Sequence, residues 1–179
     1  LRTTLSDRFQ RQVRKVLNDP DVAYHIKRLI VESLSEIVPG DDDWNLVREL
    51  TDVSPDLFER FLWRTRNDEW FFFLKDRWLP YARTHGNQPL IARFYEHLGT
   101  WLDGHPSDVL TLWLEALDEE NDNPQRVRFS IMMALKKSRY WSLPEARRIL
   151  IRLSEVCTGN EIRYLGKPLS RFVEETNSG

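Results

Sequence analysis

The sequence predicts an all-α fold, and three observations lead to that prediction. Nine prolines are spread over the 179 residues, and their mean spacing of about 18 residues suits a helix of three to four turns plus a short loop. Apolar residues recur three and four positions apart, which is the period of an amphipathic helix. Leucine, with 24 occurrences, outnumbers valine (11) and isoleucine (8) together, and no window shows the strict alternation of a half-buried strand.

Prolines are interpreted as markers of helix starts. Proline is accepted in the first helical turn because its missing N–H would be unpaired there in any case. Five prolines follow a side chain that can cap a helix: Pro20, Pro55, Pro89, Pro124 and Pro144. Combined with the apolar period, they predict helices over 6–17, 21–37, 42–52, 55–66, 68–83, 88–102, 107–119, 124–138, 143–157 and 160–175.

The apolar phase also predicts which side chains are buried. In the helix over 21–37, one stripe is expected to face the core: Val22, Ala23, Ile26, Leu29, Ile30, Leu34 and Ile37. Two segments, 70–81 and 109–117, are apolar almost all round and are expected to be covered on more than one side. Five tryptophans are assigned to the core: Trp44, Trp70, Trp78, Trp101 and Trp113. Trp63 is expected to be partly exposed, and Trp141 is placed at a loop.

Short loops make successive helices antiparallel neighbours. Two helices with their loops give a unit of about 36 to 40 residues, which is the period of HEAT-like repeats. The sequence therefore predicts a right-handed α-solenoid of about four to five antiparallel helical hairpins, with a compact helical bundle as the alternative. A single helical-repeat domain is expected over 1–176, followed by a flexible tail at 177–179. Because the chain begins at Leu1 and ends in polar residues, it is interpreted as a fragment of a larger protein.

Composition excludes several classes of protein. The formal net charge of −2 argues against a strongly basic nucleic-acid domain. A single cysteine, Cys157, allows no internal disulfide and no multi-cysteine zinc site, so a reduced, cytoplasmic setting is expected. The chain has no apolar run of about 18 residues and no signal-peptide pattern, so no membrane contact is expected.

Motifs that carry chemistry are missing from the sequence. Gly166 and Lys167 lack the glycine-rich run of a P-loop, and there is no Gly-x-Ser-x-Gly elbow. The four histidines lack the i, i+4 spacing of a helical zinc site. We therefore expect no catalytic residue, no metal ligand and no cofactor, and the chain is predicted not to be an enzyme. The acids at 41–43 are interpreted as a helix start rather than as a cation site, and those at 118–122 as a solvated loop or an acidic contact surface.

Charge is unevenly distributed along the chain. Residues 41–120 carry 8 cationic and 17 anionic side chains, whereas residues 121–179 carry 11 and 6. The basic end contains Arg126, Arg128, Lys136, Lys137, Arg139, Arg147, Arg148 and Arg152, with Tyr140 and Trp141 among them. One interpretation is a solvated face with the local pairs Glu145–Arg148 and Arg152–Glu155. The others are a nucleic-acid surface and a contact with an acidic neighbour in the parent protein.

Two groups of residues are candidates for an interaction surface. The first places an aromatic side chain among arginines, a combination typical of protein interfaces; it consists of Arg60, Trp63, Arg64 and Arg66. The second lies in the basic end and consists of Arg147, Arg148 and Arg152.

The stretch 25–34 (HIKRLIVESL), followed by Pro39 and by 43–47 (DWNLV), resembles the helical-repeat regions found beyond the NTPase module of large bacterial STAND or NACHT-type proteins. The resemblance implies a sensing or scaffolding region of a multidomain ATPase, with the nucleotide site outside this chain. The predicted function is a non-catalytic scaffold or sensor segment that mediates protein–protein or interdomain contacts. The alternative is a nucleic-acid-binding HEAT-like domain of the DNA glycosylase kind, for which no catalytic residue can be assigned.

The alternative is tested by a gel-shift titration with duplex and single-stranded DNA at several salt concentrations. We expect no shift even at low salt, where contacts to phosphate are strongest, because the total charge of the chain is not positive. A shift at low salt that weakens as salt rises would instead favour the nucleic-acid alternative.

Overall fold

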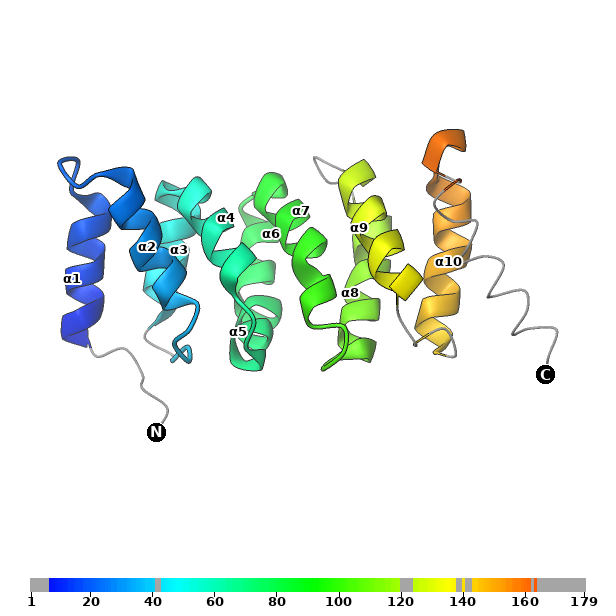
Figure 1. Ribbon diagram of the computed structural model, residues 1–179, viewed down its shortest axis with the longest axis horizontal. Helices are drawn as coiled ribbons and strands as arrows, with labels where there is room; N and C mark the ends of the chain where they lie inside the picture. The colour runs from blue at the N-terminus through cyan, green and yellow to red at the C-terminus, as the bar shows by residue number, and fades with distance from the viewer. Residues whose placement is uncertain are drawn as a thin grey trace. The chain divides into compact units, whose positions relative to one another are not determined.

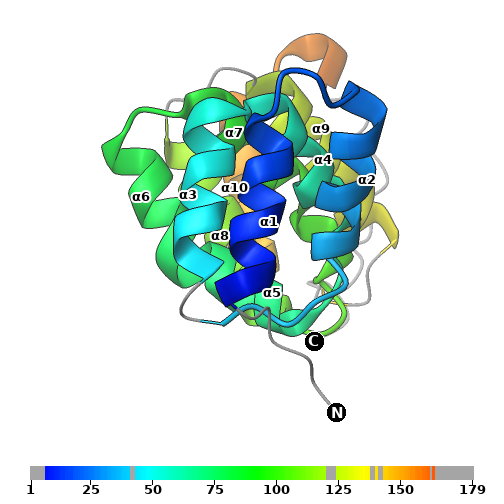
Figure 2. The same ribbon diagram turned by 90° about the vertical axis from the view of Figure 1, so that its left-hand side faces the viewer.

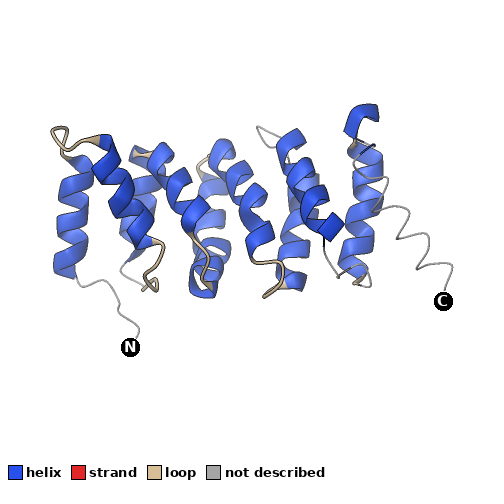
Figure 3. Ribbon diagram, in the orientation of Figure 1, coloured by secondary structure: helices blue, strands red, loops and turns tan. Residues whose placement is uncertain are grey.

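The computed structural model describes residues 7–40, 43–119, 124–137, 140, 143–161 and 163, and within these ranges its regular elements are all helices (Figures 1 and 3). They are α1 (Asp7–Asn18), α2 (Tyr24–Leu34), α3 (Trp44–Val53), α4 (Pro55–Arg64), α5 (Asp68–Phe73), the π-helix η2 (Leu74–Trp78), α6 (Leu79–Thr84), α7 (Gln88–His97), the 3₁₀-helix η3 (Leu98–Thr100), α8 (Pro106–Asp118), α9 (Pro124–Lys137) and α10 (Pro144–Val156). The all-α prediction is confirmed.

The residues form two compact units, Leu1–Leu90 and Ile91–Gly179, and each is considered separately below. The first contains α1 to α6, and the second contains most of α7 together with α8, α9 and α10. The single domain expected over 1–176 stays a prediction. The tail at 177–179 and most of the helix predicted over 160–175 lie outside the described residues.

Proline begins helices at most of the predicted positions. α4, α9 and α10 begin at Pro55, Pro124 and Pro144, and Pro89 is the second residue of α7. The prediction is wrong for Pro20, because α2 begins four residues later at Tyr24. There the Asp19 carboxylate accepts a hydrogen bond from the Asp21 N–H at 2.9 Å. This local turn around the proline replaces the first turn of the predicted helix.

The single helix predicted over 68–83 is divided into α5, η2 and α6. Pro80 has no N–H, and in a regular α-helix its ring would clash with the carbonyl of Asp76, four residues earlier. The π-helical turn accommodates the proline: the Leu79 N–H donates to the carbonyl of Leu74, five residues back. At the other end, the Asn67 side chain caps α5 by accepting from the Trp70 N–H at 2.9 Å.

Aromatic side chains from α4, α5 and η2 form the centre of the first unit. Phe58 packs on Trp78 with ring centroids 5.0 Å apart, and Phe61 meets the edge of Trp70 at 4.7 Å. All four rings are at most 2 % exposed. Such pairs add about 0.5–1.5 kcal/mol each beyond the effect of burial. The core assignment is confirmed for Trp70, Trp78, Trp101 and Trp113, whereas Trp44 is only half-buried.

The buried side of α2 differs from the predicted stripe. Val31 and Leu34 are buried, whereas Ile26 is 43 % and Leu29 is 54 % exposed. Because the helix packs through Val31 and Leu34, residues on its other side are left in solvent. The segment over 109–117 is largely buried as predicted, while Phe72 is an exposed exception in the segment over 70–81.

Alternate helices of the first unit lie side by side, α1 with α3 and α2 with α4 (Figure 2). Contacts between them join residues about 32 positions apart. Gln10 donates to Asp43 at 2.8 Å, 33 residues away, and Arg64 of α4 donates to Glu32 of α2 at 3.5 Å, 32 residues away. Within the second unit, Arg152 bonds Asp118 across 34 residues. These three bonds thus join residues 32 to 34 positions apart in sequence.

Buried hydrogen bonds join these helices. The indole N–H of Trp78 donates to the hydroxyl of Thr51 at 2.9 Å, and that hydroxyl donates to the carbonyl of Val47 at 2.8 Å. In the second unit, the indole N–H of Trp113 donates to the carbonyl of Tyr95 at 3.0 Å. The buried indoles of Trp78 and Trp113 therefore each have an acceptor, whereas the buried Nε1 of Trp70 has no hydrogen-bond partner within the described part of the chain.

A capping box follows α10. Glu161 accepts from the backbone N–H and the hydroxyl of Thr158 at 2.8 and 2.7 Å, so its side chain makes the bond of a capping box that reaches back to the N-cap N–H, while the Glu161 N–H donates to the Thr158 carbonyl. Arg128 of α9 donates to the same carboxylate at 2.8 Å. Burial would raise the pKa of Glu161, but the hydrogen bonds from Arg128 and Thr158 outweigh it and lower the pKa.

Replacing Thr51 by Val removes the acceptor of the Trp78 indole while preserving side-chain shape. We expect a loss of roughly 1–3 kcal/mol of unfolding free energy, because the buried N–H loses this hydrogen bond. Urea denaturation followed by circular dichroism measures it. Thr51→Ser retains the hydroxyl and should lose less, and Thr84→Val at an exposed site is the control. Equal stabilities of Thr51→Val and Thr51→Ser would contradict the role of this bond.

Glu161→Gln tests the capping box through the pH dependence of stability. A lowered carboxyl pKa contributes stability that is present above the unfolded-state pKa and is lost as pH falls through the folded-state pKa. The variant should lose on the order of 1 kcal/mol at neutral pH, because the neutral amide gives up the charge-assisted hydrogen bonds that the carboxylate accepts. It should also show a weaker dependence of the melting temperature on pH below about 4.5. A pH profile parallel to that of the unmodified chain would contradict the assignment.

Candidate functional site

Arg60, Trp63 and Arg64 share the outer side of α4, and Arg66 follows two residues after the helix ends. The inner side of α4 is fully buried and consists of Leu57, Phe58, Phe61 and Leu62. The period of the helix therefore turns the arginines and Trp63 to solvent. Trp63 is 40 % exposed, which confirms the prediction made from its sequence context.

The neighbouring helix α2 extends this surface. Arg64 Nη2 lies 3.5 Å from Glu32 Oε2, so the end of α4 meets α2 at that carboxylate. Leu29 lies one turn before Glu32 and Asp56 one turn before Arg60, so each shares the side of its helix. We define the α2–α4 face by six residues: Leu29, Glu32, Asp56, Arg60, Trp63 and Arg64.

The charges of the α2–α4 face are only partly compensated. Asp56 and Arg60 are exposed, and neither has an ion pair or a side-chain hydrogen bond within the described part of the chain. The Arg64–Glu32 pair is long and solvent-accessible, with 63 % of the Arg64 side chain exposed, so it contributes at most about 1 kcal/mol. Arg66 donates to the carbonyl of Thr65 at 3.0 Å. Exposed apolar side chains thus lie next to charges that are open to a partner.

The second predicted group lies on α10 and is less available. Arg152 Nε donates to Asp118 at 2.8 Å and its Nη1 to Glu155 at 2.9 Å, which confirms the predicted Arg152–Glu155 pair. The predicted Glu145–Arg148 pair does not form among the described residues, and Arg148 is exposed. Arg147 is half-buried, and its Nε has no hydrogen-bond partner there.

Other cations of the basic end are also paired with carboxylates. Arg126 and Arg93 both contact Glu96, at 3.2 and 3.0 Å, and Arg128 is bound to Glu161. The side chain of Lys137, and Arg139 and Trp141 altogether, lie outside the described residues. Much of the described positive charge is thus directed at acidic groups of the same unit.

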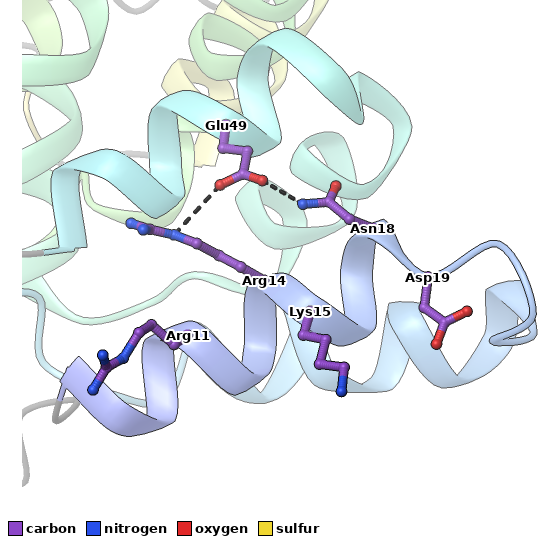
Figure 4. Close-up of a pocket in the computed structure, with 6 residues that line it drawn as sticks. All are labelled: Arg11, Arg14, Lys15, Asn18, Asp19 and Glu49. Atoms are coloured by element: carbon purple, nitrogen blue, oxygen red, sulfur yellow. Dashed lines mark hydrogen bonds and ion pairs between the residues drawn. The ribbon is translucent and has the colours of Figure 1, made fainter.

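A shallow depression of about 560 Å³ lies between α1 and α3 (Figure 4). It is lined by Arg11, Arg14, Lys15, Asn18, Asp19 and Glu49. Arg14 Nε lies 3.4 Å from Glu49 Oε2, and Asn18 donates to the other oxygen at 2.5 Å. Arg11 and Lys15 point away from Glu49 (Figure 4). Its carboxylate is therefore already satisfied, and the cations do not converge on one point.

The two acidic runs, 41–43 and 118–122, and Cys157 were also considered from the sequence, and the structure describes part of this set. Asp43 occupies the N-cap position of α3, which confirms a helix start here, but its buried carboxylate makes no capping hydrogen bond and accepts instead from the Gly40 N–H and from Gln10, at 2.6 and 2.8 Å. Asp41 and Asp42 lie outside the described residues. The acidic run at 118–122 is described only at Asp118 and Glu119. Burial, followed by the charge of Glu161, raises the pKa of the Cys157 thiol, which disfavours the nucleophilic thiolate.

Neither a metal-binding cluster nor a membrane-spanning helix is found within the described ranges. No three His, Cys, Asp or Glu side chains come together there in a way that could hold a metal ion. No helix there is both long and apolar enough to cross a bilayer.

Comparison of the chain with protein-family models finds no match, and comparisons with curated proteins and with solved structures find none either. The candidate site is thus defined by its own geometry. The sequence identified three residues of the α2–α4 face, Arg60, Trp63 and Arg64, but missed Glu32 and Asp56 and assigned Leu29 to the core. The sequence shows that Asp56 lies four residues before Arg60 on the same helix. It does not show that Glu32 of α2 approaches Arg64 of α4.

Proposed function

We propose that this chain is a non-catalytic helical-repeat segment that binds another protein surface through the α2–α4 face. The observation that carries the proposal is the exposure of Trp63 and Leu29 beside the incompletely paired Arg60 and Arg64. Tryptophan and arginine are the side chains most enriched at the energetic centres of protein interfaces. This combination supports a binding surface rather than a reaction site.

The exposed indole is large enough to matter energetically. With 40 % of Trp63 in solvent, a partner can cover roughly 100 Å² of it, which stabilises a complex by about 2–3 kcal/mol before the costs of association. Leu29 adds a second apolar contact on the adjoining helix. The arginines then favour acidic or polar groups at the rim of the interface.

The proposed architecture is a right-handed α-solenoid of about four to five helical hairpins, with a compact bundle as the alternative. The proposal is supported by the links between alternate helices at separations of 32 to 34 residues, found separately within each unit. Stacked hairpins of this kind bury a continuous core and leave a long face for partners.

We further propose that the segment belongs to a larger multidomain bacterial ATPase in the cytoplasm, with its nucleotide site outside this chain. The support is the resemblance of 25–34 and 43–47 to helical-repeat regions of STAND or NACHT-type proteins. The contacts are then made with other domains of the parent chain or with a separate protein.

Protein rather than nucleic acid is the favoured partner because of the ion pairs of the basic end. Arg126, Arg128 and Arg152 are directed at Glu96, Glu161 and Asp118. A phosphate backbone would have to displace these carboxylates before it gained the same contacts.

The test is a selection of helical peptides from a displayed random library against the full chain. We expect that most selected peptides lose at least about tenfold in affinity for Trp63→Ala, because hot-spot truncation removes more than about 1.4 kcal/mol. Phe72→Ala is the matched control, since Phe72 is also an aromatic residue of the first unit and is also 40 % exposed.

Arg60→Glu is a second test of the same surface that leaves its apolar residues in place. It should weaken the selected peptides while the melting curve of the chain stays unchanged. Selected peptides that bind Trp63→Ala and Arg60→Glu as tightly as the unmodified chain would show that the α2–α4 face is not the binding surface.

A further inference from the structure

The outer side of α4 carries its charges in a polarised order. Asp56 lies in the first turn, and Arg60 and Arg64 lie in the second half of the helix. The order agrees with the helix dipole, which favours acids at the start and bases at the end of a helix. Asp56 and Arg60 are nevertheless exposed and have no ionic partner within the described part of the chain.

This order makes α4 complementary to an antiparallel copy of itself. Asp56, Arg60 and Trp63 are spaced at i, i+4 and i+7, so they lie along one side of the helix. If a two-fold axis crosses α4 midway between Asp56 and Arg60, Asp56 faces the partner's Arg60 and Arg60 faces the partner's Asp56. A parallel pairing in register would instead place like charges together.

The antiparallel arrangement also gives the exposed apolar residues a contact. The proposed axis lies at the level of residue 58, midway between Asp56 and Arg60. Trp63 and Val53 are each five residues from that position in sequence. Trp63 is thereby brought to the start of the partner's α4, near Val53, the last residue of α3, which is 64 % exposed and lies two residues before α4 begins. Apolar contacts then flank the two central charge pairs, and the opposite charges that face one another fix the register of the two helices.

We propose that the occupant of the α2–α4 face is a second copy of this chain, docked through antiparallel α4 helices in an isologous dimer. The inference rests on the proposed function, because it takes this face to be a protein-binding surface and names its partner. Charge complementarity selects the second copy: the surface presents an acid and a base one turn apart, with each sign unpaired.

The test is sedimentation equilibrium of the full chain over a concentration series, at low and at high salt. The unmodified chain should associate to a dimer, more tightly at low salt because the charge pairs are exposed. Asp56→Arg and Arg60→Asp should each weaken association at least about tenfold, since each change places like charges opposite one another. Trp63→Ala should weaken it too, with Phe72→Ala as the control of equal exposure.

Mixing the two charge variants makes the test specific. Asp56→Arg chains carry bases at both positions, and Arg60→Asp chains carry acids at both. An equimolar mixture should therefore form heterodimers that are tighter than the homodimers of either variant. Circular dichroism of each variant verifies that α4 is intact. If association is restored in the mixture, both variants must be folded. The weaker association of each variant alone is then not caused by unfolding.

Three results would overturn the proposal: a monomeric unmodified chain throughout the series, a dimer indifferent to these substitutions, or a mixture that associates no better than its components. If the chain is monomeric and Trp63→Ala still weakens the binding of selected peptides, the second copy is overturned as the partner. The protein-binding proposal is preserved in that case. A dimer that depends on α4, combined with peptides that ignore Trp63, would overturn the proposal that other proteins bind through the α2–α4 face while preserving the second copy as its partner.

Discussion

The first unit depends on the aromatic contacts that α4 makes with α5 and η2. Phe58 against Trp78 and Phe61 against Trp70 bury the inner side of α4 completely. Because an α-helix cannot turn all its side chains inward, this burial fixes which residues face solvent. The position of Trp63 and Arg60 on the surface is thus a consequence of packing on the opposite side.

Polar contacts then fix how neighbouring helices are aligned along their length. Asn67 caps α5 and also donates to the carbonyl of Ser35, so one side chain joins a helix start to the end of α2. Thr51 gives the buried indole of Trp78 its acceptor. A buried donor without an acceptor costs more than an ordinary hydrogen bond contributes, so these bonds favour one alignment over others.

The candidate surface was only partly accessible to sequence reasoning. Trp63 among arginines was recognised because residue type and local spacing were sufficient. Leu29 was misassigned to the core because the apolar period of α2 is compatible with burial on more than one side. At the basic end, composition indicated free positive charge, but Arg126, Arg128 and Arg152 reach carboxylates that are 30 to 34 residues away in sequence.

By itself the sequence determined the helical class, most helix starts and the outward face of α4, because these follow from interactions within a few residues: the 3.6-residue period, capping and the missing N–H of proline. Only the tertiary structure decided which side of α2 is covered, how Pro80 is accommodated by a π-helical turn, and which acid each arginine meets. The covered side of α2 and the partners of the arginines depend on helices brought together from about 32 residues apart, and local spacing carries no information about that approach.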